Sequence, residues 1–262
     1  MLKKWDVTIP ALTGDAPRKA YIYLPEYYDD DPNRRFPVMY MCDGQNVFLD
    51  SDATYGKSWG MAEFLRGWEK EIIVVGIECG HDGDERLSEY LPYPANKTSW
   101  FGKYEPLGMV TLQWILEEIK PVIDRDYPTI PFRECTAIGG SSMGGIMALA
   151  GAVHFNRWFS KAACISTAMG FCQRPLLADL RSASISPDTR VFLSWGTNEA
   201  HGITDPNRED RSSKTYGWNR KAADTLLARG ADARLYCQVG GYHCEASWET
   251  QVPLFMNYLW TE

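Results

Sequence analysis

Residues 135–148 have the sequence CTAIGGSSMGGIMA, and this stretch decides the fold. It begins with an apolar run of strand length, passes through glycines and serines, and continues into small apolar residues that suit a helix. The pattern Gly140-x-Ser142-x-Gly144 lies at the junction. A strand, a sharp turn with a serine at its apex and a helix in direct succession are typical of a turn that exposes a nucleophilic hydroxyl.

Ser142 is the candidate nucleophile of this turn. Small neighbours let the strand and the helix approach each other closely, and the amino terminus of the helix would place N–H groups beside developing negative charge. Ser141 is the neighbouring candidate, but it occupies the variable position before the nucleophile. A glycine- and serine-rich turn without chemistry is the alternative, and the predicted strand and helix on either side argue against it.

Apolar runs of strand length alternate along the chain with segments of helical spacing. The predicted strands are 20–24, 37–42, 72–77, 135–138, 162–165, 190–195 and 233–239, and the predicted helices are 108–124, 218–228 and 247–259. Such alternation is typical of a mostly parallel sheet covered on both faces. We therefore expect an α/β fold of the α/β-hydrolase type, with a central sheet of about eight strands and helices on both faces. We expect residues 1–262 to form a single domain.

Two connections are long, polar and rich in glycine, asparagine and aspartate, namely 78–107 and 197–216. In this architecture the loops that leave the carboxyl ends of the strands build the site. Surface insertions without a function are the alternative, but long loops in compact domains tend to be functional. We expect both connections to border the site.

A nucleophilic serine needs an imidazole within hydrogen-bond reach, and the chain has four histidines. In α/β-hydrolases the base follows the acid in the chain and lies on the loop after the last strand. His243 occupies that position and is the candidate general base. His201 is the competing candidate, because it lies in the loop that should carry the acid. His154 lies in the helix after the serine turn, and His81 is placed as a loop residue before the nucleophile.

The acid that orients the base is expected just beyond a strand between the serine and the histidine. The predicted strand that ends at Trp195 is followed by a turn that carries Glu199, which is the first candidate. Its role would be to orient the imidazole and to stabilise the imidazolium that forms. Asp205 is the second candidate. Glu209 and Asp210 are interpreted as solvated surface charges.

An oxyanion hole needs two hydrogen-bond donors. The N–H of Met143, directly after the nucleophile, is the first, and the second should come from the loop after an early strand. The N–H of Gln45 is the candidate there, with that of Asn46 as the alternative, and Gly44 allows close approach of the backbone. A tight turn without a catalytic part is the other interpretation. The candidate substrate pocket comprises Asp43, Gly44, Asn46, Tyr90, Trp218 and Tyr242.

Composition excludes several classes of partner. A net charge of -7 and the lack of a basic run argue against nucleic acid, because phosphate binding needs clustered Lys and Arg. No apolar run approaches the length of a membrane span, and the sequence MLKKWD at the start lacks the apolar core of a signal peptide, so we expect a cytoplasmic protein. The seven cysteines are scattered and form no CxxC pair, which argues against a zinc or redox site.

Together these segments resemble the putative-esterase family of α/β-hydrolases, which includes enterochelin esterases, feruloyl and acetyl-xylan esterases, S-formylglutathione hydrolases and mycolyltransferases. The matching stretches are 21–25 with Tyr28, 36–40 into 43–48, 74–77 followed by Arg86 and Glu89-Tyr90, 137–145, and 241–243. The resemblance implies a serine hydrolase, and it supports Glu199 as the acid because the Gly-Thr-x-Glu turn looks like the acid turn of the family.

Two departures from the family pattern leave the substrate open. The early loop begins Asp43-Gly44 where many members have His-Gly, and residues 200–217 form a longer stretch than usual between acid and base. The family itself spans aryl, sugar, siderophore and thiol esters.

The sequence thus predicts a carboxylic ester hydrolase that acts on a small-molecule ester. Ser142 attacks the ester carbonyl, His243 carries the proton, and water releases the acyl group, so neither a metal nor an organic cofactor is needed. Transfer of the acyl group to an alcohol acceptor is the first alternative, and an inert binding protein of the same fold is the second. A homo-oligomer is compatible with the sequence.

Overall fold

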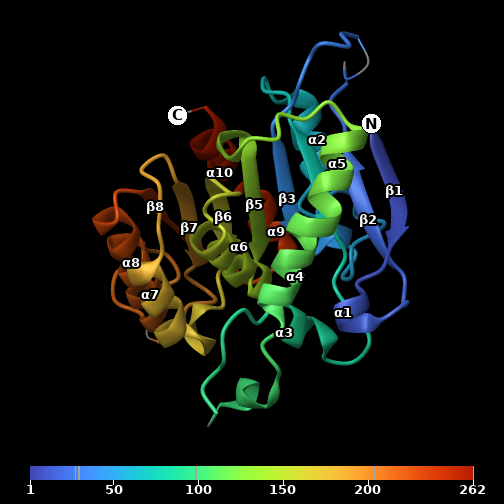
Figure 1. Cartoon of the computed structure of the whole chain (residues 1–262). Helices are drawn as coiled ribbons and strands as arrows, with labels where there is room; N and C mark the ends of the chain where they lie inside the picture. The colour runs from blue at the N-terminus through green and yellow to red at the C-terminus, as the bar shows by residue number, and fades with distance from the viewer. Residues whose placement is uncertain (27, 29, 98, 203, 262) are drawn as a thin grey trace.

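Eight strands of the described part of the chain form one sheet in the order β1-β2-β4-β3-β5-β6-β7-β8 (Figure 1). The computed structural model describes residues 1–26, 28, 30–97, 99–202 and 204–261. Strands β3 to β8 are mutually parallel, whereas β2 runs antiparallel to both of its neighbours. The strands are β1 Leu2–Val7, β2 Arg18–Tyr23, β3 Val38–Cys42, β4 Ile73–Ile77, β5 Thr136–Ser141, β6 Lys161–Ile165, β7 Arg190–Gly196 and β8 Asp232–Gln238.

Helices cover both faces of this sheet. The α-helices are α1 Pro10–Thr13, α2 Met61–Gly67, α3 Glu85–Glu89, α4 Gly108–Trp114, α5 Lys120–Asp126, α6 Met143–His154, α7 Gln173–Ser182, α8 Lys214–Ala228, α9 Glu245–Glu249 and α10 Val252–Trp260. Helices α4 to α8 contribute to one apolar core, and α2 and α10 contribute to a second core on the opposite face. Figure 1 shows α4, α5 and α6 on the near side of the sheet and α10 on the far side.

The burial of the central strands follows from this two-sided cover. Every residue of β4 is buried, as expected for a strand whose two faces both pack against helices. The predicted α/β architecture and the mostly parallel sheet of about eight strands are confirmed.

Several elements differ from the expectation at the level of residues; α8, for example, begins at Lys214 and not at residue 218. Strand β1 was not among the predicted strands, because its lysines and aspartate break any apolar run and it lies at the edge of the sheet. The expected helix 247–259 is two helices, and Pro253, which has no N–H to donate, stands in the first turn of the second. The helix expected over 108–124 runs to Asp126, with a π-helical turn at Ile115–Ile119 between α4 and α5.

The sheet brings the ends of three parallel strands together. Strands β5, β6 and β7 are neighbours, so Ser142, Ser166 and Thr197, the residues that directly follow them, lie along one edge. In parallel sheets the carboxyl edge is where loops assemble a site. Polar residues far apart in the sequence therefore meet at this edge.

Candidate active site

Ser142 occupies a strained turn between β5 and α6. Its backbone has φ 58° and ψ −118°, which is unusual for any residue other than glycine. A Cβ at Gly140 would lie 2.7 Å from the backbone of Gly144, so glycine is required where the strand passes the helix. The side chain of Ser142 is half-buried, whereas that of Ser141 is buried. The turn therefore presents Ser142 and hides its neighbour.

The segment after β6 holds this turn from the side. The N–H of Ser142 donates to the carbonyl oxygen of Ile165 at 2.9 Å, and the carbonyl oxygen of Ser142 accepts from the N–H of Ala168 at 3.0 Å. A Cβ at Gly145 would approach Oγ1 of Thr167 to 2.9 Å. The strained backbone is thus fixed by hydrogen bonds and by close packing against residues 165–168.

The imidazole of His243 lies against the carboxylate of Glu199. Its Nδ1 pairs with Oε2 of Glu199, and the loop after β8 that carries His243 is tied to the turn after β7 by a hydrogen bond from the N–H of Asn198 to the carbonyl oxygen of Gly241, at 3.0 Å. The Glu199 side chain is 9% exposed and that of His243 is 45% exposed. The arrangement suits an orienting acid behind an accessible base.

The second oxygen of Glu199 has its own donors. Oε1 accepts from the N–H of Gly196 at 2.5 Å and from the hydroxyl of Ser166 at 2.6 Å. The indole N–H of Trp248 in turn donates to Oγ of Ser166 at 2.8 Å. Both carboxylate oxygens are therefore held by the protein.

Ser142 and His243 line the same cavity, which has a volume of about 940 Å³. No hydrogen bond joins their side chains in the part of the chain that the structure describes. Catalytic hydrogen bonds are often long in free enzymes and shorten when substrate binds. Glu199 and Met143 also line this cavity, so the predicted nucleophile, base, acid and first oxyanion donor are brought together.

Both long connections supply walls of this cavity. Connection 78–107 contributes Arg86, Leu87 and Phe101. Connection 197–216 contributes Asn198, Glu199, His201 and Thr215. This is the position we expected for these loops.

Aromatic rings form the wall away from the serine. Phe101 stacks on Phe171 with ring centroids 3.6 Å apart, and Trp218 lies 5.6 Å from the ring of His201. A Cβ at Gly170 would lie 2.5 Å from the ring of Trp218, so the ring rests directly on the glycine backbone. This wall offers flat apolar surfaces to a ligand.

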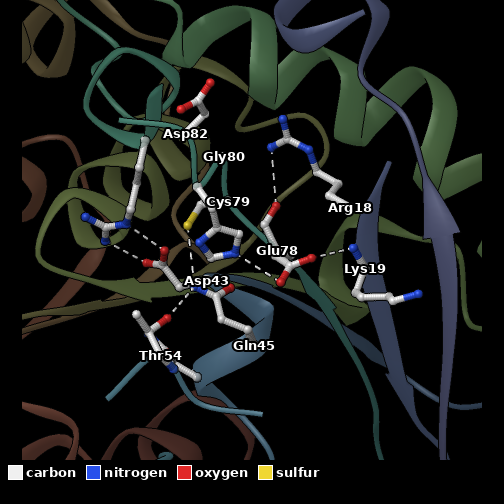
Figure 2. Close-up of polar contacts among 12 residues, drawn as sticks. Arg18, Lys19, Asp43, Gln45, Thr54, Glu78, Cys79, Gly80 and Asp82 are labelled. Atoms are coloured by element: carbon white, nitrogen blue, oxygen red, sulfur yellow. Dashed lines mark hydrogen bonds and ion pairs between the residues drawn. The ribbon is translucent and has the colours of Figure 1, made fainter. Parts of the chain in front are cut away.

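The loop after β3 is held by a partly buried ion pair of Asp43, which Figure 2 labels. Nε and Nη2 of Arg86 donate to the two carboxylate oxygens of Asp43 at 2.6 and 2.7 Å. Burial alone would lower the pKa of the guanidinium, but the charge and hydrogen bonds of Asp43 raise it above its ordinary value. The N–H of Asp43, whose φ is 55°, donates to the phenol oxygen of Tyr90 at 3.0 Å. These contacts fix an unusual backbone beside the serine turn.

Four of the six candidate pocket residues do not line the cavity. Asp43, Gly44, Asn46 and Tyr90 are buried and are not among the cavity-lining residues, whereas Trp218 and Tyr242 do line it. Gly44 packs against the backbone of β4, where a Cβ would meet the carbonyl carbon of Gly76 at 2.5 Å.

The second oxyanion donor is less directly placed than the first. The N–H of Asn46 is engaged, since it donates to the carbonyl oxygen of Asp43 at 2.8 Å, which leaves Gln45 as the better candidate. Gln45 is buried and does not line the cavity, and its side-chain amide faces Sγ of Cys79 at 3.4 Å and Oγ1 of Thr54 at 3.5 Å, as Figure 2 shows.

The other three histidines are not paired with Glu199 in the part of the chain that the structure describes. His154 ends α6 and pairs with Asp179 at 3.4 Å, and His81 is exposed and faces Glu78 at 3.0 Å. His201 lines the cavity beside Trp218.

Of the loop carboxylates, Asp205 and Glu209 are exposed and pair with nearby arginines, but Asp210 is not a surface charge as expected. Asp210 is 5% exposed. It accepts hydrogen bonds from Nε1 of Trp195 at 3.1 Å, from the N–H groups of Ser212 and Ser213, and from the Ser213 hydroxyl. Burial alone would raise its pKa, but these donors lower the pKa below its ordinary value. The carboxylate thus joins the start of α8 to a cavity-lining tryptophan.

Sequence reasoning missed the residues that follow β6, namely Ser166 to Ala168 together with Gly170 and Phe171, all of which line the cavity. No motif marks them. Their place after the strand next to the serine strand was the available signal, because neighbouring strand ends share an edge.

Among the described residues, no cluster of His, Cys, Asp and Glu is arranged to hold a metal ion. Within the same residues, no helix has the length and hydropathy needed to cross a membrane.

A family model described as "Putative esterase" matches residues 13–258. Comparison with curated proteins gave no match. Among solved structures, the fold is similar to an IroE-like serine hydrolase from Shewanella oneidensis (20% identity, TM-score 0.72, 98% of this chain and 81% of that chain). It is also similar to the BES protein from Bacillus cereus (19% identity, TM-score 0.73, 98% of this chain and 94% of that chain). A third similar structure is the siderophore hydrolase EstA from Aspergillus nidulans (17% identity, TM-score 0.66, 98% of this chain and 94% of that chain).

Proposed function

We propose that this chain, which belongs to the putative esterase family, hydrolyses carboxylic esters through an acyl-enzyme on Ser142. One observation carries the assignment of residues: Ser142 on its strained turn, His243 and Glu199 line one cavity, and the base is paired with the acid. These residues come from three chain segments that are far apart in the sequence and that meet at the cavity.

In the proposed reaction, Oγ of Ser142 attacks the ester carbonyl while Nε2 of His243 takes the hydroxyl proton. Glu199 holds Nδ1 and stabilises the imidazolium. The imidazolium then gives its proton to the leaving alcohol, and a water molecule, deprotonated by the same imidazole, attacks the acyl-enzyme. The imidazolium finally returns that proton to Oγ of Ser142 as the bond between Oγ and the acyl carbon breaks and the carboxylic acid leaves, so the serine and the imidazole regain their starting states.

The developing oxyanion would be stabilised by the N–H of Met143, the first residue of α6. The first N–H groups of a helix have no acceptor within the helix, and the helix dipole adds positive potential. The N–H of Gln45 is the proposed second donor.

The aromatic wall supports an ester with a bulky, flat acyl or aryl group. Phe101, Phe171 and Trp218 line the cavity and offer aromatic surface to such a group. We further propose that residues 1–262 form one domain. The cytoplasmic location and the homo-oligomer remain predictions from the sequence.

The proposal is tested by labelling with a fluorophosphonate probe and by a panel of esters. Stoichiometric modification at Ser142 is expected, together with hydrolysis of some of p-nitrophenyl acetate, butyrate and octanoate, methyl ferulate, acetylated xylo-oligosaccharide and a catecholate ester. Product analysis with added alcohols separates hydrolysis from acyl transfer. A protein that neither reacts with the probe nor cleaves any ester would be the inert binding protein.

A further inference from the structure

The carboxylate of Glu199 is held through both of its oxygens. Oε2 faces Nδ1 of His243, while Oε1 accepts from the N–H of Gly196 and from the hydroxyl of Ser166, at 2.5 and 2.6 Å. Two donors on one oxygen fix the plane of a carboxylate, and hydrogen bonds to an ionised group are the stronger kind. Of these two hydrogen bonds to Oε1, the one from Ser166 comes from a side chain and the one from Gly196 comes from the backbone.

Trp248 decides which way the Ser166 hydroxyl points. A hydroxyl has one proton to donate, and an indole N–H can only donate. Because Nε1 of Trp248 donates to Oγ of Ser166 at 2.8 Å, the hydroxyl oxygen is the acceptor there and its proton is left for Glu199. Trp248 is 5% exposed, and its ring lies edge-on to His243 with centroids 5.2 Å apart.

Ser166 makes this contact from an unfavourable backbone. Its φ is 46°, in the left-handed region that suits glycine and that a serine adopts at a cost. Such strain persists where the surroundings compensate for it, and it gathers at functional sites. A glycine would fit the backbone here better but would leave Oε1 of Glu199 without the side-chain donor.

The same segment fixes the nucleophile. Ile165 and Ala168, on either side of Ser166, hold the N–H and the carbonyl oxygen of Ser142. A displacement of Ser166 would therefore disturb both the acid and the serine turn.

We propose that Ser166 and Trp248 are positioning residues, which orient Glu199 behind His243 and thereby set kcat. The inference rests on the proposed function. Neither residue exchanges a proton with the substrate. The hydrogen bonds from Trp248 to Ser166 and from Ser166 to Glu199 hold the carboxylate in place against the imidazole.

The first test removes the hydroxyl in two ways. Ser166→Ala and Ser166→Gly should each lower kcat by about tenfold to a hundredfold, as small misplacements of catalytic groups do, and should leave KM within about twofold. Ser166→Gly should be at least as stable as Ser166→Ala in thermal unfolding, because glycine accepts the positive φ. If the glycine variant unfolds at a temperature close to that of the wild type, its loss of kcat does not come from unfolded protein.

The second test removes the indole donor. Trp248→Phe keeps an aromatic ring against His243 but loses the N–H, and it should lower kcat by several-fold in the wild type and have little further effect in Ser166→Gly. The matched control is Trp59→Phe, since Trp59 is equally buried, packs 5.9 Å from Trp248 and makes no contact with the acid. This control should keep wild-type kcat.

A double-mutant cycle with Glu199→Gln separates positioning from a general structural role. If Ser166 acts through the Glu199 carboxylate, Ser166→Gly should cost much less in the Glu199→Gln background than in the wild type. Equal losses in both backgrounds, or wild-type kcat in Ser166→Gly, would overturn the inference. Both results are distinct from failure of the proposed function, in which Ser142→Ala would keep its esterase activity.

Discussion

Gly196 and Gly241 are in main-chain contact so close that a Cβ on Gly196 would overlap the carbonyl oxygen of Gly241. Gly196 ends β7, and Gly241 lies in the loop after β8. This contact lets the loop lie over the end of the neighbouring strand, so His243 reaches Glu199 across 44 positions of sequence. The acid–base pair thus depends on two glycines that take no part in the chemistry.

Ser142→Ala should lower kcat by several orders of magnitude and leave the fold intact, because only a hydroxyl at an accessible turn is lost. Esterase assays and thermal unfolding of the purified variant check this. Ser141→Ala is the matched control, since Ser141 is the buried neighbour, and its effect should be far milder. Near-wild-type turnover by Ser142→Ala would refute the assignment of the nucleophile.

Glu199→Gln should lower kcat by about 10² to 10⁴, because the amide keeps the shape but loses the charge and favours the wrong tautomer of the imidazole. Asp205→Asn should leave kcat unchanged, since Asp205 is exposed and lies 3.5 Å from Arg208. Steady-state kinetics of the two variants side by side decide between these carboxylates. The reverse outcome would make Asp205 the acid.

The value of kcat/KM should rise as the pH is raised from acid toward neutrality, because only the neutral form of the imidazole can accept the serine proton. The measurement is kcat/KM from pH 5 to 8 under conditions where chemistry limits the rate. His243→Ala should remove this rise of kcat/KM with pH, together with most of the activity. A flat wild-type profile would count against the histidine as base.

Asp210→Asn should destabilise the protein at pH 7 by about 2 kcal/mol, the size of a hydrogen bond to a charged group. The fold lowers the pKa of Asp210, so its contribution is present above the ordinary value of 3.8 and is lost as pH falls through the lower, folded value. The difference from wild type should therefore shrink in acid. Urea unfolding of the variant and the wild type at pH 7 and in acid checks this. Glu209→Gln is the control, because Glu209 is the exposed neighbour of Asp210, and its stability should match that of the wild type at pH 7.

Gly170→Ala should narrow the cavity, because the new methyl group would push the Trp218 ring away from its present place. The ratio of kcat/KM for p-nitrophenyl octanoate to that for the acetate should fall about tenfold, as expected when a pocket loses room for part of a substrate. Gly217→Ala is the control, since it adds a methyl group beside Trp218 where no atom lies within 4 Å. An unchanged ratio would mean that Trp218 does not limit the acyl group.

Local sequence patterns determined the sheet, the serine turn and the order of the candidate residues. The strand, glycines and helix around Ser142 are one continuous stretch, and steric demands at Gly140 and Gly144 act between residues only four apart. Apolar runs likewise predicted seven of the eight strands. The central strands are covered on both faces and are therefore apolar along their length. Strand β1 was not predicted because its lysines and aspartate interrupt any apolar run.

Tertiary structure alone decided which polar groups meet and which are buried. Asp210 looked like its neighbour Glu209 in the sequence, and only the approach of Trp195 and the start of α8 supplied the donors that bury it. Ser166 carries no motif, and its hydroxyl matters because β6 happens to lie between the strands that lead to Ser142 and Glu199. Hydrogen bonds between groups tens of residues apart depend on strand order and loop path, and these are properties of the packed sheet that no local pattern encodes.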